Sequence, residues 1–269
     1  MKQLLTIAGS DPTGGAGIQA DLKTFAALGT YGMSCICAVV AENTTRVTAV
    51  QNITPDMVTA QLTDVYDDIP PDSVKTGMLS TPAIVRAVAD FLRAHRGPPV
   101  VVDPVMVATS GGLLLEPEAV DIYREALFPE AALITPNIPE AEVLTGMTIR
   151  NADDMARAAE ALLSYGCGAA LVKGGHRVED ALDVLADGRG VHTFRGRRVD
   201  TKNTHGTGCT LSSALAVFLA RGLALEDAVA AAKSYLTGAL ESAAKGSVGK
   251  GSGPVDHFWF YGKRWGVME

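Results

Sequence analysis

Short apolar segments alternate along this chain with longer amphipathic segments, and this alternation restricts the possible folds more than any other feature. The apolar segments, many of them β-branched, cover residues 4–9, 34–41, 99–103, 131–135 and 169–175. Alanine-rich segments with helical periodicity cover residues 16–28, 55–67, 82–95, 117–127, 151–165, 208–221 and 225–243. Strands that alternate with helices form parallel sheets through crossover connections. The sequence therefore predicts an α/β fold with a mostly parallel central sheet.

Residues 180–199 have a different pattern, with short strand-like segments separated by turns. We expect them to form an antiparallel edge on the sheet. The chain has 269 residues, of which 47% are hydrophobic, and contains neither an internal repeat nor a low-complexity linker. These values suit one large core, so we expect a single domain over residues 1–269.

The charge and cysteine content argue against several classes of partner. The net charge is −7 and no basic block offsets it, so we expect a small-molecule substrate rather than nucleic acid or an anionic membrane surface. The four cysteines lack paired CxxC spacing, and neither a signal peptide nor an apolar run of membrane-spanning length is evident. A cytoplasmic protein is the simplest expectation.

The segment GSDPTGGAGIQAD at 9–21 follows the first predicted strand, where ligands bind in open α/β sheets. Its GAGIQA stretch satisfies GxGxxA, and Glu42 ends the next strand, so an NAD-dependent oxidoreductase is one alternative. Five residues, Ser10 to Gly14, separate the strand from this pattern, which argues against a dinucleotide turn. Asp21 suits either a ligand contact or a solvated carboxylate in the first turn of a helix.

Polar residues also follow the later strands. Asp103 ends one apolar segment, and Asn137 and Glu140 follow the next. Oxygen ligands of this kind suit Mg²⁺, although Asn137 and Glu140 equally suit a helix cap with its third-position glutamate. Lys173 ends a further apolar segment, where a buried lysine needs a partner, and a phosphate is the natural one.

The segment NTHGTGC at 203–209 leads directly into a predicted helix. Gly206 and Gly208 let backbone amides converge at the positive end of that helix, which predicts an anion site. The same helix terminus should lower the pKa of Cys209, and His205 could share its proton. Covalent catalysis, phosphoryl transfer and simple packing of Cys209 at a helix start all remain open at this point.

Several segments together resemble a known family. These are LTIAGSDPTGGAGIQADLKTFAALGTYG, KTGML, VVDPVMVATSG, LITPNIPEAEVL, LVKGGH and TKNTHGTGCTLSSALA, with GKGSGPVDHF at 249–258. They are similar to the hydroxymethylpyrimidine/phosphomethylpyrimidine kinases of thiamine biosynthesis, within the ribokinase-like superfamily. The resemblance implies a three-layer α/β fold with helices on both faces of the sheet, a homodimer, and two phosphorylations of an aminopyrimidine alcohol (HMP) with MgATP, through its monophosphate to the diphosphate.

The resemblance also implies roles for individual residues. Cys209 would accept the hydroxyl proton beside Gly206 and Gly208 of the anion site, and His205 is the residue paired with that cysteine in related pyridoxal kinases. The remaining implied site residues are Gly9, Asp21, Glu42 and Met78 for the pyrimidine, Lys173, Thr204, Thr207 and Asn137 for ATP phosphates, and Asp103 and Glu140 for Mg²⁺.

Glu42 departs from the family pattern, because the family usually has AQNT where this chain has AENT. A glutamine amide both donates and accepts, whereas a carboxylate only accepts. Glu42 could select a protonated ring through a bidentate contact, could mark a pyridoxine-type substrate, or could itself be protonated. Pyridoxal kinase activity, alone or in addition, is therefore the close alternative, and a non-catalytic binding protein is a third.

Overall fold

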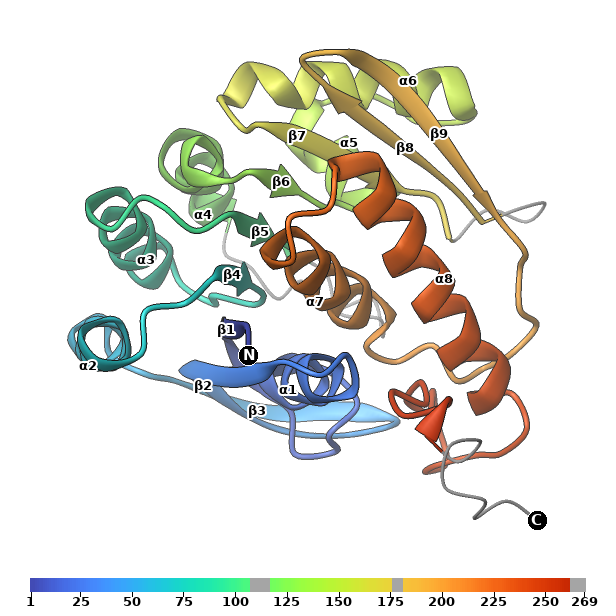
Figure 1. Ribbon diagram of the computed structural model, residues 1–269, viewed down its shortest axis with the longest axis horizontal. Coiled ribbons are helices and arrows are strands. Elements are labelled where there is room, and N and C mark those ends of the chain that lie inside the picture. The colour runs from blue at the N-terminus through green and yellow to red at the C-terminus, as the bar shows by residue number, and fades with distance from the viewer. Residues whose placement is uncertain (107–116, 176–180, 262–269) are drawn as a thin grey trace.

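A computed structural model describes residues 1–106, 117–175 and 181–261 of the chain (Figure 1). Within them lies one nine-stranded sheet in the order β3-β2-β1-β4-β5-β6-β7-β8-β9. Neighbouring strands from β2 to β7 are parallel, while β3 pairs antiparallel with β2, and β8 and β9 continue antiparallel from β7. The strands are β1 Gln3–Ser10, β2 Tyr31–Asn43, β3 Arg46–Asn52, β4 Ser73–Thr76, β5 Val100–Val102, β6 Leu133–Ile134, β7 Ala169–Lys173, β8 Ala181–Asp187 and β9 Gly190–Gly196.

Helices cover both faces of the sheet (Figure 1). One face packs against α1 Gly17–Ala27, α7 Thr207–Ala220 and α8 Leu225–Ala243, through a core that includes Phe25 and Leu215. The other face packs against α2 Pro55–Asp68, α3 Pro82–Ala94, α4 Pro117–Ile122, α5 Ile138–Thr145 and α6 Ala152–Leu162. The predicted three-layer α/β architecture is confirmed.

Local sequence explains where several helices begin. Thr54 and Thr81 cap α2 and α3 by accepting hydrogen bonds from backbone amides of the first turn, and a proline follows each of them at the first helical position. Threonine caps and first-turn prolines are typical helix starts. The helix expected over 117–127 is α4 continued by a π-helical turn, Tyr123–Leu127. A 3-10 turn, Phe128–Glu130, follows it, and another, Leu163–Tyr165, extends α6.

The strand order reverses at β1, which lies between β2 and β4. The chain runs from β1 to β2 on one side and from β4 towards β7 on the other, so loops diverge above the carboxyl ends of β1 and β4. Such a switch point is where open α/β sheets bind ligands. Helix α7 packs against β1, β4 and β5, which brings its first turn to this edge.

Two strands and one helix were not expected from the sequence. The antiparallel edge predicted near 180–199 is confirmed as β8 and β9, but a second edge, β3, lies at the opposite end of the sheet. Every residue of β3 is exposed, so it carries no alternation of buried and exposed positions. The second unexpected strand is β4, a short strand that contains Lys75. The unexpected helix is the short α5, which begins directly after Asn137, in the segment for which only a helix cap was considered.

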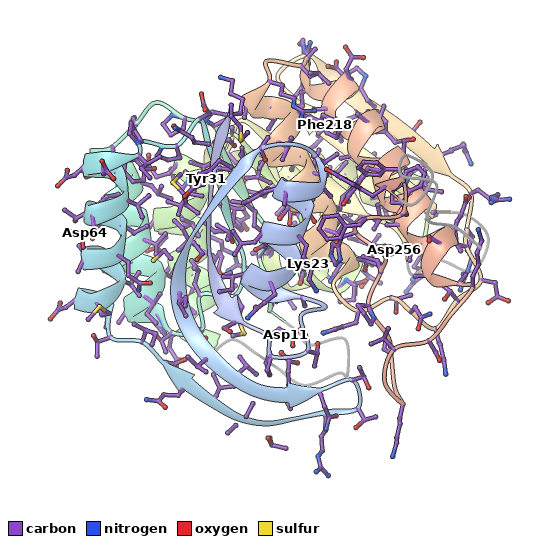
Figure 2. All side chains as sticks on the ribbon, turned by 60° about the horizontal axis from the view of Figure 1, so that its bottom comes forward. Asp11, Lys23, Tyr31, Asp64, Phe218 and Asp256 are labelled. Atoms are coloured by element: carbon purple, nitrogen blue, oxygen red, sulfur yellow. The ribbon has the colours of Figure 1, made fainter. Side chains whose placement is uncertain are left out.

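The side chains follow this layering in Figure 2. Asp64 points outward from α2, and Asp11 lies between the β2–β3 ribbon and the start of α1. In the described part of the chain, no helix is both long and apolar enough to cross a membrane.

Candidate functional site

The loop between β1 and α1 is organised around the buried carboxylate of Asp11. Its Oδ1 accepts the Thr13 amide at 2.7 Å, and its Oδ2 accepts the Thr13 hydroxyl at 2.8 Å and the Gly15 and Ala16 amides at 3.1 and 2.8 Å. Burial opposes ionisation of Asp11, but hydrogen bonds from His205, Thr13 and Ala16 outweigh it and lower its pKa to about 2. The loop is therefore held by a fixed negative charge.

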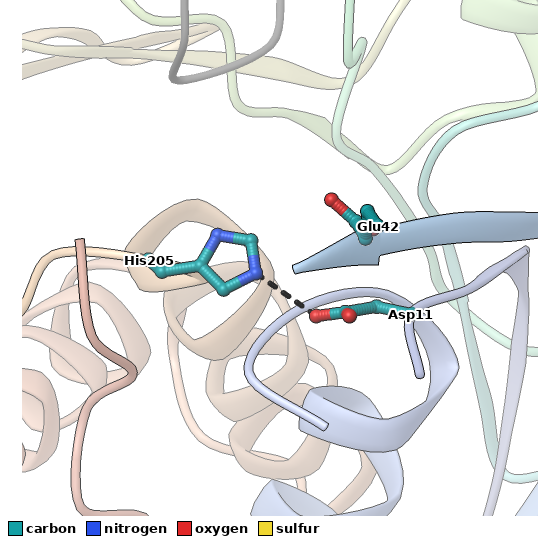
Figure 3. A group of neighbouring side chains, drawn as sticks. All are labelled: Asp11, Glu42 and His205. Carbon is teal, nitrogen blue, oxygen red and sulfur yellow. Dashed lines mark hydrogen bonds and ion pairs between the residues drawn. The ribbon is translucent and has the colours of Figure 1, made fainter. Parts of the chain in front are cut away.

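His205 reaches this carboxylate from the segment that precedes α7 (Figure 3). Its Nε2 lies 2.9 Å from Asp11 Oδ2. Because Asp11 is ionised and can only accept, Nε2 carries the proton of this bond. The hydrogen bond to Asp11 raises the pKa of His205 despite partial burial, and the charges of Asp11 and Glu42 act in the same direction.

Glu42 completes a group of three with Asp11 and His205. A carboxylate oxygen of Glu42 lies within 4.8 Å of the nearest ligand atoms of the other two (Figure 3). Burial and the Asp11 charge raise the pKa of Glu42, and His205 opposes them. Asp11 Oδ2 already accepts four hydrogen bonds, one of them from His205, which leaves this oxygen little capacity to bind a metal ion.

Gly9 and Met78 lie together at the ends of β1 and β4. A Cβ atom on Gly9 would come within 2.7 Å of Met78 Cε, so the absence of a side chain at Gly9 leaves room for the methionine. The structure thus brings together two residues that the resemblance assigns to the pyrimidine pocket. Glu42 lies near the end of the neighbouring strand β2, immediately after a register shift in its pairing with β3.

The first turn of α7 forms the centre of the site. Gly206 precedes the helix with φ of 76°, in the left-handed region that favours glycine, and a Cβ there would lie 1.8 Å from the Gly15 carbonyl oxygen. Among the described residues, no acceptor is present for the amides of Gly208 and Cys209. Free amides at a helix N-terminus form an anion site, as the sequence predicts.

Asp103 and Lys173 form an ion pair beside this turn. Lys173 Nζ donates to Asp103 Oδ1 at 2.8 Å, and Thr135 and Ser212 donate to the same carboxylate at 3.3 Å. A Cβ on Gly208 would lie 3.3 Å from Asp103 Oδ2 and 3.4 Å from Lys173 Nζ, so the pair adjoins the helix backbone. Lys173, expected to meet a phosphate, is paired with Asp103 in this structure.

Asn137 and Glu140 form the helix cap that the sequence offered as one alternative. The Asn137 side chain accepts the Glu140 amide at 2.9 Å, and Glu140 Oε2 accepts the Asn137 amide at 2.8 Å. Among the described residues, the hydrogen bond that Glu140 Oε1 accepts is a long one, 3.4 Å from the Met106 amide. Burial raises the pKa of Glu140 to about 7, with Lys173 opposing the rise and Asp103 adding to it.

Asp21 lies beneath the site, so its interpretation as a solvated carboxylate is wrong. Its side chain is fully buried and accepts hydrogen bonds from Lys75 Nζ at 2.8 and 2.9 Å. The Thr6 and Ser213 hydroxyls donate to it at 2.6 and 2.7 Å. Asp21 is buried because its side chain points from α1 towards the sheet, where Lys75 of β4 lies opposite it.

The prediction of a lowered pKa for Cys209 is wrong in this structure. Burial raises the pKa of this thiol to about 11, and the favourable charge of Lys75 does not offset it. A hydrogen bond from the backbone of Gly17, the first residue of α1, also favours the thiolate. A helix terminus favours a thiolate, but removing the charge of Cys209 from water costs more here.

His205 also differs from its expected role as the partner of Cys209. In the described ranges its ring bonds to Asp11, and no hydrogen bond joins it to Cys209. Thr204 bonds to the Ser252 hydroxyl at 3.2 Å, while Thr207 is the partly exposed first residue of α7. Residues 107–111 of the motif VVDPVMVATSG, and His176 of LVKGGH, lie outside the described residues.

Sequence reasoning missed Asp11 and Lys75 as members of the site. The SDPT turn offered a signal for Asp11, because aspartate in such turns binds nearby backbone amides. Lys75 offered a weaker one, a lysine within a short β-branched segment. The GxGxxA pattern does not form the turn itself, since α1 begins at its third residue, Gly17, after a six-residue loop from Asp11 to Ala16.

A family model described as phosphomethylpyrimidine kinase matches residues 11–256. The hydroxymethylpyrimidine/phosphomethylpyrimidine kinase of Escherichia coli strain K12 is 51% identical over 256 residues, which cover 94% of this chain and 96% of that protein.

Solved structures show the same likeness. The 2.06 Å crystal structure of phosphomethylpyrimidine kinase from Clostridium difficile 630 is 45% identical, with a TM-score of 0.79 over 88% of this chain and 98% of that one. The ADP complex of Bacillus subtilis pyridoxal kinase is 39% identical, with a TM-score of 0.89 over 97% of this chain and 99% of that one.

Proposed function

Because the chain belongs to the phosphomethylpyrimidine kinase family, we propose that it phosphorylates HMP with ATP and then phosphorylates the monophosphate to the diphosphate. The observation that carries this proposal is the free amide turn of α7, which lies beside Cys209 at the switch point of the sheet. That turn supplies fixed backbone N–H groups, which can stabilise the negative charge of the transferred phosphoryl group.

The transfer has a simple balance of bonds. The substrate hydroxyl oxygen bonds to the γ-phosphorus of ATP, the bond from that phosphorus to the β,γ-bridging oxygen breaks, and ADP leaves. The amides of Gly208 and Cys209 would hold the negative charge of the phosphoryl group, and the Lys173 ammonium lies close enough to assist. Cys209 would accept the hydroxyl proton in its thiolate form, which the pKa of about 11 makes scarce at neutral pH but strongly basic.

Asp103 and Glu140 fit a magnesium ion. Both carboxylates are buried, the Asp103 charge helps to raise the pKa of Glu140, and among the described residues Glu140 Oε1 accepts a single hydrogen bond, of 3.4 Å. A cation between them would relieve that repulsion, and oxygen donors with few carboxylates suit Mg²⁺. When bound there, Mg²⁺ would neutralise charge on the phosphate oxygens of ATP.

The substrate ring would bind between Met78, Gly9 and Glu42. The apolar Met78 side chain over Gly9 offers a surface for the ring, and Glu42 offers only acceptors to its polar edge. His205 and Asp11 form a hydrogen-bonded pair beside Glu42, so the edge that binds there lies next to an imidazole ring as well as to carboxylates. A protonated aminopyrimidine would match Glu42 best, since its amino group and ring N–H both donate.

The first experiment supplies MgATP and, separately, HMP, its monophosphate and pyridoxal to the purified protein, and analyses the products by mass spectrometry. We expect HMP to gain one phosphoryl group and then a second. Phosphorylation of pyridoxal alone would favour the activity named for the Bacillus subtilis relative. Ligand-induced stabilisation without ATP consumption would indicate a binding protein, and retention of NAD but not ATP would favour an oxidoreductase.

A second experiment compares the Glu42→Gln variant with the wild type. If ionised Glu42 selects a protonated ring or a pyridoxine-type donor, the variant changes the ratio of kcat/KM for HMP and pyridoxal, and that ratio loses its pH dependence. Equal substrate ratios and pH profiles in the two proteins would contradict both ionic interpretations.

We infer that the protein forms a homodimer through the β2–β3 ribbon. Strand β3 is a fully exposed edge, and Val39, Val47 and Val50 expose apolar side chains on this ribbon. Light scattering after size-exclusion chromatography should show a dimer, and Val50→Lys should yield a monomer. Val143→Lys, at a similarly exposed valine on α5, is the control, and a monomeric wild type would refute the inference.

We expect this enzyme in the reducing cytosol, since its four cysteines are free.

A further inference from the structure

The glycine-rich segment at 249–254 lies between the two halves of the site. It follows α8 and has the sequence GKGSGP. Its alternate glycines allow close approach. A Cβ on Gly251 would lie 1.9 Å from the Thr44 carbonyl oxygen, and a Cβ on Gly253 would lie 2.3 Å from Asn203 Oδ1. The segment therefore packs both against the turn between β2 and β3 and against the residues that precede α7.

Thr44 holds this segment to the β2–β3 turn. Its Oγ1 accepts the amides of Lys250 and Gly251 at 3.2 and 3.1 Å, and its carbonyl oxygen accepts the Ser252 amide at 3.1 Å. Glu42, which would bind the polar edge of the substrate ring, lies two residues before Thr44 near the end of β2. Three consecutive amides are thus bonded to the turn that follows Glu42.

The same segment is bonded to the chain that leads into α7. The Gly253 carbonyl oxygen accepts the His205 amide at 3.0 Å, immediately before the anion site. The Ser252 hydroxyl donates to the Lys202 carbonyl oxygen at 3.0 Å and lies 3.2 Å from Thr204 Oγ1. Ser252 therefore bonds to the β2–β3 turn through its amide and to the chain before α7 through its hydroxyl.

The residues that follow the glycine-rich segment are fixed to α8 and α7. The Ser242 hydroxyl donates to Asp256 Oδ2 at 2.7 Å, and the Tyr235 hydroxyl donates to the His257 carbonyl oxygen at 2.7 Å. His257 Nε2 lies 3.2 Å from the hydroxyl of Thr210, in the first turn of α7. Because this end is fixed, the segment holds the β2–β3 turn at a set distance from α7.

We propose that Thr44 is a positioning residue, which through residues 250–253 holds the pyrimidine edge of the site in place relative to the phosphate-binding start of α7. This inference deepens the proposed function and rests on it, since it needs the substrate ring beside Glu42 and the reacting phosphate at α7. Each half of the site keeps its own contacts without Thr44, so the affinity for either ligand alone depends little on this residue. The distance between the two bound ligands does depend on it, and a misplacement of about 1 Å can lower a rate about 100-fold.

The kinetic test compares Thr44→Val, which keeps the shape of the side chain and removes its acceptor oxygen, with Thr44→Ser, which retains that oxygen. We expect Thr44→Val to lower kcat for HMP about tenfold or more, while the KM values for HMP and ATP change less than about threefold, and Thr44→Ser to restore kcat. Thr63→Val is the matched control, because that hydroxyl donates to a backbone carbonyl oxygen on the exposed side of α2. An unchanged kcat in Thr44→Val, or a rise in KM alone, would overturn the proposal.

Hydrogen exchange in the ligand-free protein, followed by mass spectrometry, tests the connection without any activity. Two amides lose their acceptor in Thr44→Val, so we expect exchange in peptides that contain residues 250–252 to accelerate about fivefold, the factor that corresponds to one net hydrogen bond. Exchange in the peptide that contains His205 should accelerate as well, because its amide is bonded to the same segment. Acceleration confined to residues 250–252 would show that Thr44 acts only locally and would overturn the proposal.

A pair of glycine variants tests the same contact from the opposite side. Gly251→Ala places a Cβ against the Thr44 carbonyl oxygen, whereas no described atom lies within 4 Å of a Cβ on Gly246, five residues earlier. Gly251→Ala should lower kcat and accelerate exchange near His205, and Gly246→Ala should do neither. Equal behaviour of the two variants would contradict the proposal. If the wild type phosphorylates none of the substrates, the proposed function fails, and the exchange comparison still decides whether Thr44 is connected to the start of α7.

Discussion

Replacing Gly206 with alanine should weaken both the fold and the activity, and the structure gives the size of each effect. Gly206 has φ of 76°, and a Cβ would lie 1.8 Å from the Gly15 carbonyl oxygen, where contacts under 3.0 Å essentially never occur. The left-handed conformation alone costs an alanine about 1–2 kcal/mol. The contact also forces the loop before α1 and the start of α7 apart by about 1 Å or more. Overpacking of this kind adds about 1–3 kcal/mol.

The matched control lies at the other end of the same helix. Gly222 has φ of 81°, and nothing lies within 4 Å of the position its Cβ would take. Gly222→Ala should therefore lose only the conformational term of about 1–2 kcal/mol and keep its kcat/KM. Urea unfolding followed by circular dichroism measures the free energy of unfolding of each variant.

The activity of Gly206→Ala should fall much further than its stability suggests. The anion-binding amides of α7 and the Gly17 contact to Cys209 lie on the two segments that must separate. A displacement of about 1 Å in a reacting geometry can lower the rate about 100-fold, so we expect kcat/KM to fall by roughly that factor. Equal destabilisation of the two variants, with unchanged activity in Gly206→Ala, would refute the argument.

Three further outcomes are expected. Asp11→Asn should lower the pKa of His205 towards its ordinary value, which NMR titration of the imidazole measures. In the wild type, the contribution of Asp11 to the free energy of unfolding is present above about pH 4 and is lost as the pH falls through about 2. Because burial raises the pKa of Glu140 to about 7, the free energy of unfolding should decline as pH rises from 4.5 to 7; urea titrations should show that decline removed in Glu140→Gln. Asn137→Ala should cost about 1 kcal/mol in the same assay, since it removes the acceptor for the Glu140 amide.

The sequence predicted those parts of the fold in which the pattern of apolar residues matches the pattern of buried positions. The helices at 82–95 and 151–165 have one apolar face each and are present as α3 and α6, while the strand at 4–9 is a continuous apolar run that is buried on both faces as β1. Strand β3 could not be predicted in this way, because every residue in it is exposed. Strand β4 was hidden by Lys75, since a lysine in a central strand contradicts the burial pattern unless its partner is known.

The sequence predicted which loops contain the site residues, but not which of those residues contact one another. Cys209, Lys173 and Asp103 were found because each lies at a strand end or a helix start. The bond between Asp11 and His205 joins residues 194 positions apart, and local sequence contains no information on such a pairing. The error over the Cys209 pKa has the same origin, because burial depends on elements packed from elsewhere in the chain.

The two buried lysine–aspartate pairs beside α7 differ in one property that assigns them different tasks. Lys173 is 13% exposed and its pair adjoins Gly208, whereas Lys75 and Asp21 are 0% exposed. A lone buried charge is costly, so each carboxylate offsets the desolvation of its lysine before a ligand arrives. A phosphate and a cation could then each take one member of the Lys173–Asp103 pair, and the charge balance would survive the exchange. The Lys75–Asp21 pair is fully enclosed, so its two members would stay paired with each other while the substrates bind and leave.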